Sequence, residues 1–184
     1  MKSALVLVVF VLFNVFLIAN AGPMQTLNTV PEVDLNRYVG TWYEIARLPN
    51  WFQKKCSGDV TATYTLLEDG RISVLNSCRG ADGQLTQAEG TAKKATANGP
   101  NSKLKVRFAP KILSFLPFVW GDYWIINLAA DYGYAVVGEP SRKYLWILSR
   151  TPKMDDALLQ SIIGEVKQQG YDLSGLIRTK HTEQ

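Results

Sequence analysis

The sequence contains little of the two residue types that most often carry catalysis or bind metals: one histidine and two cysteines among 184 residues. The histidine, His181, lies next to the C-terminus, where disorder is the usual state. A Ser–His pair, a histidine-bound haem and a histidine-based zinc site all need a histidine inside the fold. Nucleophile elbows and phosphate-binding glycine loops are also absent. We therefore expect no catalytic residue, no metal site and no cofactor.

Charge of one sign is not in large excess. The 20 Lys and Arg residues stand against 16 Asp and Glu residues, which gives a formal net charge of +4. The basic residues are scattered along the chain instead of forming one block. We therefore expect no nucleic-acid partner.

Long apolar runs are absent except at the N-terminus. Met1-Lys2 precedes an apolar run over residues 4–18 that only Asn14 interrupts, and Ala19-Asn20-Ala21 then has the small-x-small pattern of a signal peptidase site. We expect residues 1–21 to be a cleaved signal peptide. A transmembrane anchor is the alternative, but the run is short for a bilayer and no basic stop-transfer cluster follows it.

Cleavage after Ala21 leaves residues 22–184, a length that suits one domain with one core. Gly22 and Pro23 follow the cleavage site, so the new N-terminus has no cysteine to carry a lipoprotein-type anchor. We expect an exported protein. The leader is compatible with the periplasm and with full secretion.

The two cysteines flank a predicted β-hairpin. Segments 60–66 and 72–78 are rich in β-branched and aromatic residues, and Glu68-Asp69-Gly70 supplies a tight turn between them. This hairpin brings Cys78 opposite a position a few residues from Cys56. Because an exported chain meets an oxidising compartment, we expect a Cys56–Cys78 disulfide, with two separate buried thiols as the alternative. A bridge would leave no cysteine nucleophile.

Short segments of alternating apolar and polar residues recur along the chain and predict an all-β fold. Their connections are mostly short and rich in turn residues, which favours an eight-stranded antiparallel up-and-down barrel. The predicted strands are 39–48, 60–66, 72–78, 84–93, 103–108, 123–128, 134–138 and 144–150. Residues 151–155 then resemble a helix cap, and apolar residues recur at helical spacing from Leu158 until Gly170. One C-terminal helix should pack outside the barrel.

Three sequence blocks resemble the signature motifs of the lipocalin family. Residues 40–47, Gly-Thr-Trp-Tyr-Glu-Ile-Ala-Arg, resemble the G-x-W motif of the first strand in the form typical of the bacterial lipocalin and apolipoprotein D branch. Residues 131–135 (Asp-Tyr-Gly-Tyr-Ala) resemble the second motif and residues 148–152 (Leu-Ser-Arg-Thr-Pro) the third. Three blocks in order are more specific than a lone G-x-W. The best-known bacterial members carry a cysteine after the leader, whereas this chain has Gly22.

The resemblance implies how one end of the barrel is closed. In the family, the tryptophan equivalent to Trp42 lies on the barrel floor, and the arginine equivalent to Arg150 crosses its ring in a cation–π contact. We expect Gly40, Trp42 and Arg150 to be structural residues without a catalytic role.

Strand alternation predicts which side chains line the barrel, with Trp42 and Arg150 as the inward reference residues. The predicted ligand-binding lining is Glu44, Ala46, Ala62, Tyr64, Val74, Asn76, Tyr123, Ile125, Tyr134, Trp146 and Leu148. Eight-stranded barrels, lipocalins among them, can hold one small ligand. Small inward residues such as Ala46 and Ala62 favour a cavity over a barrel filled by its own side chains.

Glu44 is an acidic residue that this alternation places in an apolar interior, where an unpaired carboxylate is costly. We expect a tyrosine hydroxyl, Asn76 or an ordered water to bind it. A local twist that turns Glu44 toward solvent is the alternative.

The connection at residues 112–120 is more apolar than a surface loop normally is. In an up-and-down barrel it lies at one rim, which we take to be the open one, and Lys105, Arg107 and Lys111 are close in sequence. The predicted rim residues are Phe115, Leu116 and Phe118. They would contact an anionic membrane or guide an acyl chain, and a lid folded inward or a homodimer contact are the alternatives.

The resemblance to bacterial lipocalins implies a fatty acid or a lysophospholipid as ligand. The protein would then serve lipid transport, storage or envelope maintenance, in the periplasm, after secretion or at the periphery of the outer membrane. The alternative is an interaction or dimeric surface module that binds no stoichiometric lipid.

Overall fold

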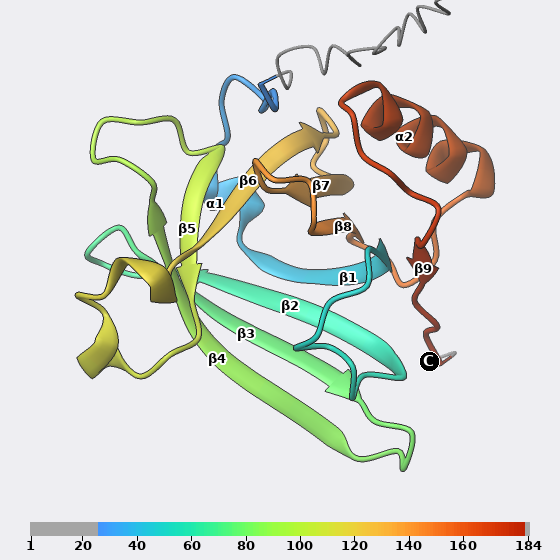
Figure 1. The fold of residues 1–184 in the computed structure, drawn as a ribbon, viewed down its shortest axis with the longest axis horizontal. Coiled ribbons are helices and arrows are strands. Elements are labelled where there is room, and N and C mark those ends of the chain that lie inside the picture. The colour runs from blue at the N-terminus through green and yellow to red at the C-terminus, as the bar shows by residue number, and fades with distance from the viewer. Residues whose placement is uncertain (1–25, 183–184) are drawn as a thin grey trace, which may run out of the picture.

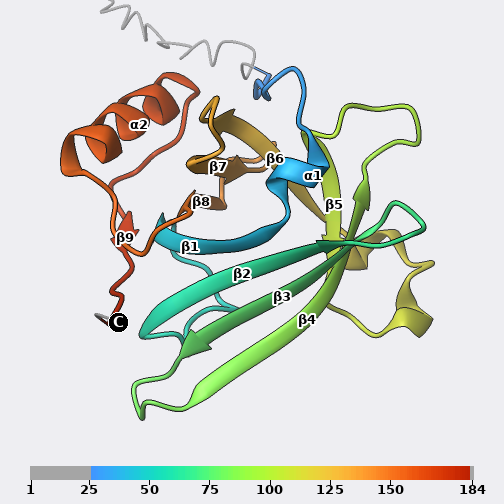
Figure 2. The same cartoon turned by 180° about the vertical axis from the view of Figure 1, so that it is seen from behind.

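The structure is a computed structural model that describes residues 26–182. The expected signal peptide lies outside these residues. The elements are α1 (Leu35–Tyr38), β1 (Gly40–Arg47), β2 (Gly58–Leu66), β3 (Ile72–Arg79), β4 (Leu85–Lys94), β5 (Lys103–Arg107), η1 (Lys111–Leu113), η2 (Pro117–Val119), β6 (Gly121–Leu128), β7 (Tyr134–Gly138), β8 (Leu145–Ser149), α2 (Asp156–Gln168) and β9 (Ile177–Arg178). Figures 1 and 2 show them from opposite sides.

Strands β1 to β8 form a closed antiparallel barrel in which neighbours in sequence are neighbours in the sheet. Pairing of β1 with both β8 and β2 closes the barrel, with Tyr43 opposite Ser149 on one edge and Thr61 on the other. The predicted eight-stranded up-and-down order is confirmed. The strand bounds differ from the predicted ones by at most two residues, since strand ends carry weak sequence signals.

The C-terminal segment fills a gap between β1 and β2. The β1–β2 pairing ends at Tyr43, and further along the same edge of β1 the short strand β9 pairs with Ala46 and Arg47. The following residues bridge both strands, because the amide of Thr179 donates to the carbonyl of Ile45 and the amide of Asp59 donates to the carbonyl of Lys180. Strand β9 was not predicted, since two residues are too short to show a period.

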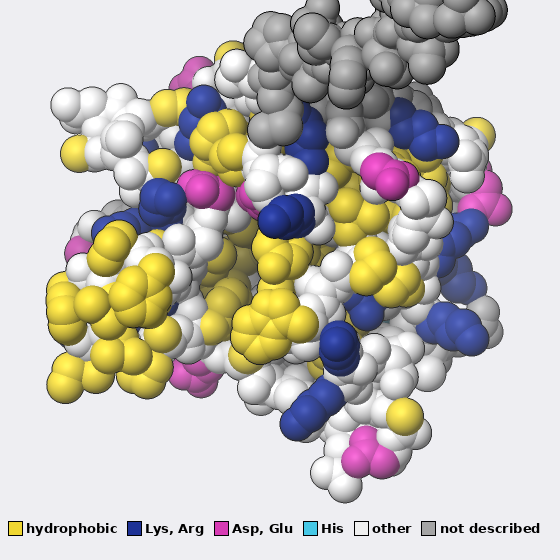
Figure 3. Space-filling view, viewed as in Figure 1, with side chains coloured by type: hydrophobic (Ala, Val, Ile, Leu, Met, Phe, Trp, Pro, Cys, Tyr) yellow, Lys and Arg dark blue, Asp and Glu magenta, His cyan; other side chains and the backbone are white. Residues whose placement is uncertain are grey.

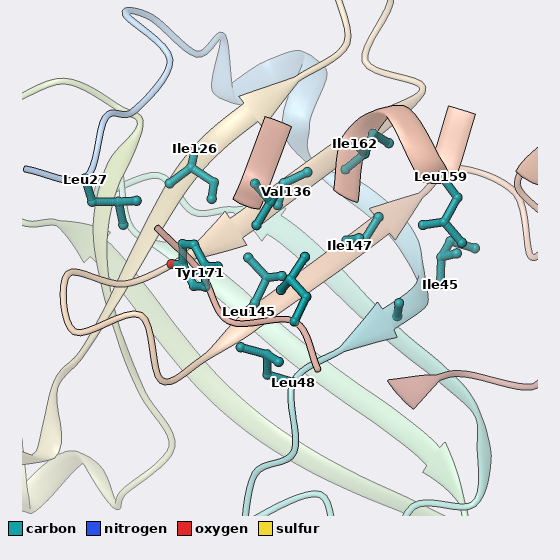
Figure 4. Packing of buried hydrophobic residues seen from close by; sticks show 13 residues of the cluster. Leu27, Ile45, Leu48, Ile126, Val136, Leu145, Ile147, Leu159, Ile162 and Tyr171 are labelled. Carbon is teal, nitrogen blue, oxygen red and sulfur yellow. The ribbon is translucent and has the colours of Figure 1, made fainter. Parts of the chain in front are cut away.

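The barrel wall separates two apolar clusters. The inner cluster contains Val33, Tyr38, Trp42, Tyr64, Ile72, Val74, Ala92, Leu104, Ile125, Ala135, Val137 and Leu148. The outer cluster lies between α2 and the strands β6, β7, β8 and β1, and Figure 4 shows Leu159 and Ile162 of the helix beside Val136, Ile147 and Ile45. The predicted outer helix is confirmed, and its buried residues recur at helical spacing.

Helix α2 covers only part of the barrel. Its N-cap is Asp155, whose side chain accepts a hydrogen bond from the amide of Leu158 (3.0 Å), as the expected cap requires. On β3 and β4, which no helix covers, most outward residues are polar, as in the pairs Ser73–Thr91 and Ser77–Gln87. The outside of the barrel is therefore apolar mainly where α2 packs on it.

The expected disulfide is confirmed. Cys56 and Cys78 are bonded, with their Cα atoms 5.5 Å apart. The bridge ties the β1–β2 connection to the end of β3, and no free cysteine remains among the described residues.

Candidate functional site

Arg150 and Trp42 close one end of the barrel. The guanidinium carbon of Arg150 lies 3.8 Å from the centre of the Trp42 ring, so the expected cation–π contact is confirmed. The indole Nε1 of Trp42 donates to the carbonyl of Tyr38 (2.8 Å). The guanidinium also donates, over 2.8 to 3.1 Å, to the backbone carbonyls of Arg37, Tyr38, Val39 and Thr41. Arg150 therefore also caps the C-terminal end of α1, whose last carbonyls have no partner within the helix.

The other two motifs meet Arg150 at this end. Gly40 has a φ of +95°, and a Cβ atom there would lie 3.3 Å from Nη1 of Arg150, which explains why glycine occupies this position. In the second motif, the hydroxyl of Tyr132 accepts from the amide of Asp34 (2.9 Å), and the guanidinium of Arg37 stacks on the Tyr132 ring at 4.0 Å. All these contacts hold separate parts of the chain together at this end of the barrel.

Three tyrosines form a hydroxyl cluster inside the barrel. The hydroxyl oxygen of Tyr123 lies 2.8 Å from that of Tyr38 and 2.9 Å from that of Tyr64. Burial raises the pKa of all three phenols, that of Tyr64 to about 12, so they stay uncharged at neutral pH. Together with five aliphatic residues they surround a small cavity, whose other lining residues are Ile72, Val74, Ala92, Leu104 and Val106. The centre of a water molecule can occupy about 10 Å³ of this cavity, so the cavity has room for about one water.

The other half of the interior is open. Asn76 shares the inward face of β3 with Val74, and it lies opposite Ala62 on β2 and Ala88 on β4. Although all three are in mid-strand, Ala62 and Asn76 are only half-buried and Ala88 is exposed. This exposure is on the inner side of the sheet, next to the stretch of β4 before Thr91 that does not pair with β5. Figure 3 shows a hollow in the molecular surface in which hydrophobic side chains are visible.

Most predicted lining residues lie on the inner side, and their contact with a ligand stays a prediction. The inner cluster and the residues packed on it include Ala62, Tyr64, Val74, Tyr123, Ile125, Trp146 and Leu148. Ala46 and Tyr134 belong instead to the outer cluster under α2, so their assignment to the lining was wrong. A register shift between Glu44 and Ala46 resets the alternation in β1. In β7 the alternation of inward and outward side chains is shifted by one residue from the prediction: Ala135, and not Tyr134, faces the interior.

Glu44 is buried in a network that the sequence analysis did not predict. Its carboxylate, 2% exposed, accepts from Nη1 of Arg47 (2.9 Å), from Nε2 of Gln53 (2.8 Å) and from the hydroxyl of Thr179. The expected partners, a tyrosine hydroxyl or Asn76, were wrong, and so was the alternative of a solvent-facing Glu44. Gln53 also accepts from the indole of Trp146 (2.9 Å). The network thus joins β1, β8, the β1–β2 connection and the C-terminal segment.

His181 is part of the fold, so its expected disorder was wrong. Its side chain is 5% exposed, and Nε2 lies 2.8 Å from the backbone carbonyl oxygen of Glu44. The ring packs edge-on against Tyr43, and Nδ1 lies 3.9 Å from a carboxylate oxygen of Asp59. No serine or cysteine is among these described partners. Within residues 26–182, no group of three or more His, Cys, Asp or Glu residues is placed to hold a metal ion.

The connections opposite the Arg150 end expose large apolar side chains. In the β5–β6 connection, Ile112, Phe115 and Phe118 are 80%, 77% and 80% exposed, and Figure 3 shows hydrophobic side chains gathered at this side of the molecule. We call these three residues the apolar rim. Leu116, the third predicted rim residue with Phe115 and Phe118, lies in the same connection and is half-buried. Trp51, 72% exposed in the β1–β2 connection, was missed, although an apolar residue in a polar stretch was a usable signal.

Some basic residues near the apolar rim contact other side chains of the protein, and others are exposed to solvent. Lys105 forms an ion pair with Asp122 (2.9 Å), and the guanidinium carbon of Arg107 lies 5.2 Å from the centre of the Trp120 ring. Lys111 is exposed beside the rim, and Lys54 and Lys55 are exposed next to Trp51 in the β1–β2 connection. Exposed positive charge therefore lies at the same end as the exposed apolar residues.

Comparison with known proteins identifies the family. The family model described as Lipocalin-like domain matches residues 33–181. The chain belongs to the lipocalin family. Among its relatives, temperature-induced lipocalin-1 of Arabidopsis thaliana is 42% identical over 160 residues, which are 86% of this chain and 85% of that protein. Outer membrane lipoprotein Blc of Escherichia coli K12 is 38% identical over 166 residues, or 90% and 89% of the two chains, and apolipoprotein D of Mus musculus is 32% identical over 154 residues, or 79% and 76%.

Solved structures show the same fold. Insecticyanin of the tobacco hornworm Manduca sexta superposes with a TM-score of 0.63 at 21% identity, over 88% of each chain. The cockroach allergen Per a 4 also has a TM-score of 0.63, at 20% identity, over 87% of this lipocalin and 94% of the allergen. Among the described residues, no helix is long and apolar enough to cross a membrane.

Proposed function

We propose that this lipocalin binds a small hydrophobic ligand inside its barrel, of the fatty acid or lysophospholipid class, and serves lipid transport, storage or maintenance of a cell envelope. The observation that carries the proposal is the shape of the interior. Its wall is apolar, Arg150 closes one end, and small mid-strand residues such as Ala62 face open space toward the other. We propose binding without catalysis.

Burial of an acyl chain supplies the driving force. Each methylene group that leaves water contributes about 0.8 kcal/mol, so a chain of about ten such groups supplies enough for tight binding after the cost of association. The open half of the barrel is accessible as it stands. In the half near the tyrosines, the small cavity must widen to admit more than one or two atoms.

The names of two relatives support a lipid connection. Blc of Escherichia coli is called an outer membrane lipoprotein, and the mouse relative is called apolipoprotein D. For this chain we propose export through a signal peptide at residues 1–21, to the periplasm or the cell exterior. Gly22 stands where a lipid-modified cysteine would be needed, so we propose no covalent lipid at that site.

The open end favours contact with a membrane surface. Three apolar rim residues are at least 77% exposed, and such exposure is costly unless a membrane, ligand or partner covers it. Exposed Lys54, Lys55 and Lys111 give this end the positive charge that attracts anionic headgroups. We propose that the protein collects or delivers its ligand at an anionic membrane. A homodimer through the same residues is the competing outcome.

Ligand binding is tested by filling the open half of the barrel. Ala62→Trp places an indole ring on the inner face of β2, and Thr63→Trp places the same ring on the outer face of the same strand. We expect Ala62→Trp to weaken the affinity for dodecanoate and lauroyl lysophosphatidylcholine at least tenfold, in displacement of a fluorescent probe, while Thr63→Trp retains wild-type affinity. Equal affinities in both folded variants would show that neither ligand uses this space.

Membrane contact is tested separately. Phe115→Ser/Phe118→Ser should reduce flotation with vesicles of phosphatidylglycerol and phosphatidylcholine, whereas Leu158→Ser, an exposed leucine on α2, should not. If flotation is unchanged and the double variant converts a dimer to a monomer in size-exclusion chromatography, the apolar rim is a dimer contact.

A further inference from the structure

The tyrosine cluster contains more hydrogen-bond donors than its own contacts use. Three phenolic hydroxyls carry three hydrogens, but only two oxygen–oxygen contacts join them, Tyr38 to Tyr123 and Tyr64 to Tyr123. Among the described residues, these hydroxyls make no other hydrogen bond. Whichever way the hydroxyls rotate, one O–H donor is left over. Tyr38 and Tyr64 are 2% and 7% exposed and Tyr123 is half-buried, so this surplus donor lies in a largely enclosed site, where an unmade hydrogen bond is costly.

The surplus donor faces a cavity of suitable size. All three tyrosines line the small cavity, and its room for about one water also fits one carbonyl or ester oxygen. The cavity adjoins the open half of the barrel, because Tyr64 and Ala62 are successive inward residues of β2, as Val74 and Asn76 are of β3. A ligand that fills the open half therefore places its inner end at the tyrosines.

The cavity is suited to an uncharged group. Its eight lining residues are tyrosines and aliphatic residues, so an anion there would have no cation in contact with it. The guanidinium of Arg150, whose charge acts on Tyr38 and Tyr64, lies against Trp42 and donates to backbone carbonyls. Burial raises the pKa of the three phenols, which keeps them protonated as donors.

We propose that Tyr38, Tyr64 and Tyr123 form a hydrogen-bond-donating subsite for an uncharged oxygen acceptor at the inner end of a hydrophobic ligand. Ketones, esters, aldehydes and un-ionised carboxylic acids carry such a group. These ligands bind with the oxygen innermost, whereas a lysophospholipid keeps its charged headgroup at the open end. The proposal rests on the proposed function, because it requires ligand binding inside the barrel.

A matched pair of ligands isolates the subsite. 2-Dodecanone and dodecane have the same chain length and differ in one carbonyl near the end. The triple variant Tyr38→Phe/Tyr64→Phe/Tyr123→Phe removes every hydroxyl while keeping the rings, a change that is nearly neutral for folding because donors and acceptors disappear together. We expect it to weaken 2-dodecanone binding about threefold to tenfold, the effect of one net hydrogen bond, and to change dodecane binding less than twofold.

Further variants separate a hydrogen bond from a general change of the core. The double variant Tyr38→Phe/Tyr64→Phe leaves the Tyr123 hydroxyl without a protein partner and should keep the preference for the ketone. Tyr134→Phe, the same chemical change on the outer side of the barrel, should leave both ligands unaffected. Lauroyl lysophosphatidylcholine should bind the triple variant as tightly as the wild type.

The outcomes distinguish the two proposals. If neither dodecane, 2-dodecanone nor lysophosphatidylcholine binds the wild type, the proposed function fails. If all bind and the triple variant changes both twelve-carbon ligands equally, the tyrosine subsite is wrong and water fills the small cavity. Infrared spectra of 2-dodecanone bound to the wild type give a second readout that needs no variant: we expect the carbonyl stretch at lower wavenumber than in hexane, and an unshifted band would overturn the proposal.

Discussion

Replacing Arg150 with alanine should lower the free energy of unfolding by about 3 kcal/mol. The cation–π contact with Trp42, at 3.8 Å, contributes about 0.5 to 1 kcal/mol. The hydrogen bonds to the part-buried carbonyls of Tyr38 and Val39 contribute about 1 kcal/mol each after allowance for water that reaches them in the variant. The carbonyls of Arg37 and Thr41 are exposed, and water replaces the guanidinium there at little cost.

The loss is measurable by thermal and urea unfolding. For a domain of this size, about 3 kcal/mol corresponds to a fall of about 6 to 12 °C in Tm. Arg178→Ala is the matched control, because Arg178 forms one exposed ion pair with Asp156 (2.7 Å) and such pairs contribute at most about 1 kcal/mol. The Tm of Arg150→Lys should lie between those of Arg150→Ala and Arg178→Ala, since one ammonium cannot reach four carbonyls.

Two results would refute this reasoning. Equal stabilities of Arg150→Ala and Arg178→Ala would show that the closed end does not depend on the guanidinium. Unchanged stability together with loss of ligand binding would make Arg150 a ligand contact instead of a structural residue.

Three further predictions concern other parts of the barrel. Cys56→Ala/Cys78→Ala should lose about 3 kcal/mol in urea unfolding, because the bridge closes a loop with a sequence separation of 22; equal midpoints with and without reductant would contradict this. Gly40→Ala should lose about 1 to 2 kcal/mol because its φ is +95°, and an unchanged Tm would show that the backbone can relax there. Hydrogen bonds from Thr182 lower the pKa of Asp59, so the stability that Asp59 adds is present above its unfolded pKa of about 3.9 and is lost as pH falls through the lower folded value. Hydrogen exchange should then show release of the C-terminal segment in acid in the wild type, and Asp59→Asn should lack this pH dependence.

Features set by local period or by a motif could be predicted from the sequence. The eight strands follow from alternation and turn residues, helix α2 from helical spacing, and the Arg150–Trp42 contact from the family resemblance. The prediction of which side chains face the barrel interior was wrong for two residues. Ala46 follows a register shift that leaves no mark in the residue pattern, and the phase of the short strand containing Tyr134 had no reference residue.

The tertiary role of the C-terminal segment could not be predicted in the same way. His181 and Thr179 contact Glu44 across more than 130 residues of sequence, and no local pattern encodes such a contact. The tyrosine cluster is a similar case: Tyr64 and Tyr123 were each placed inside, but that the hydroxyl of Tyr123 meets those of Tyr64 and Tyr38 depends on strand register and on the position of α1.

The two ends of the barrel differ in how they can accommodate a ligand. At the closed end, Arg150 fixes the start of β1 and the end of α1 through several backbone carbonyls, so this end resists widening. At the open end, β2 has left β1 after Tyr43, and the gap is bridged by the two-residue strand β9 and by side-chain bonds around Glu44. Side-chain bonds and a two-residue pairing constrain the strands less than a continuous ladder of backbone bonds. Widening of the small cavity near the tyrosines therefore requires movement of side chains above a fixed floor, and the gap between β1 and β2 is a part of the wall that only such weaker constraints hold.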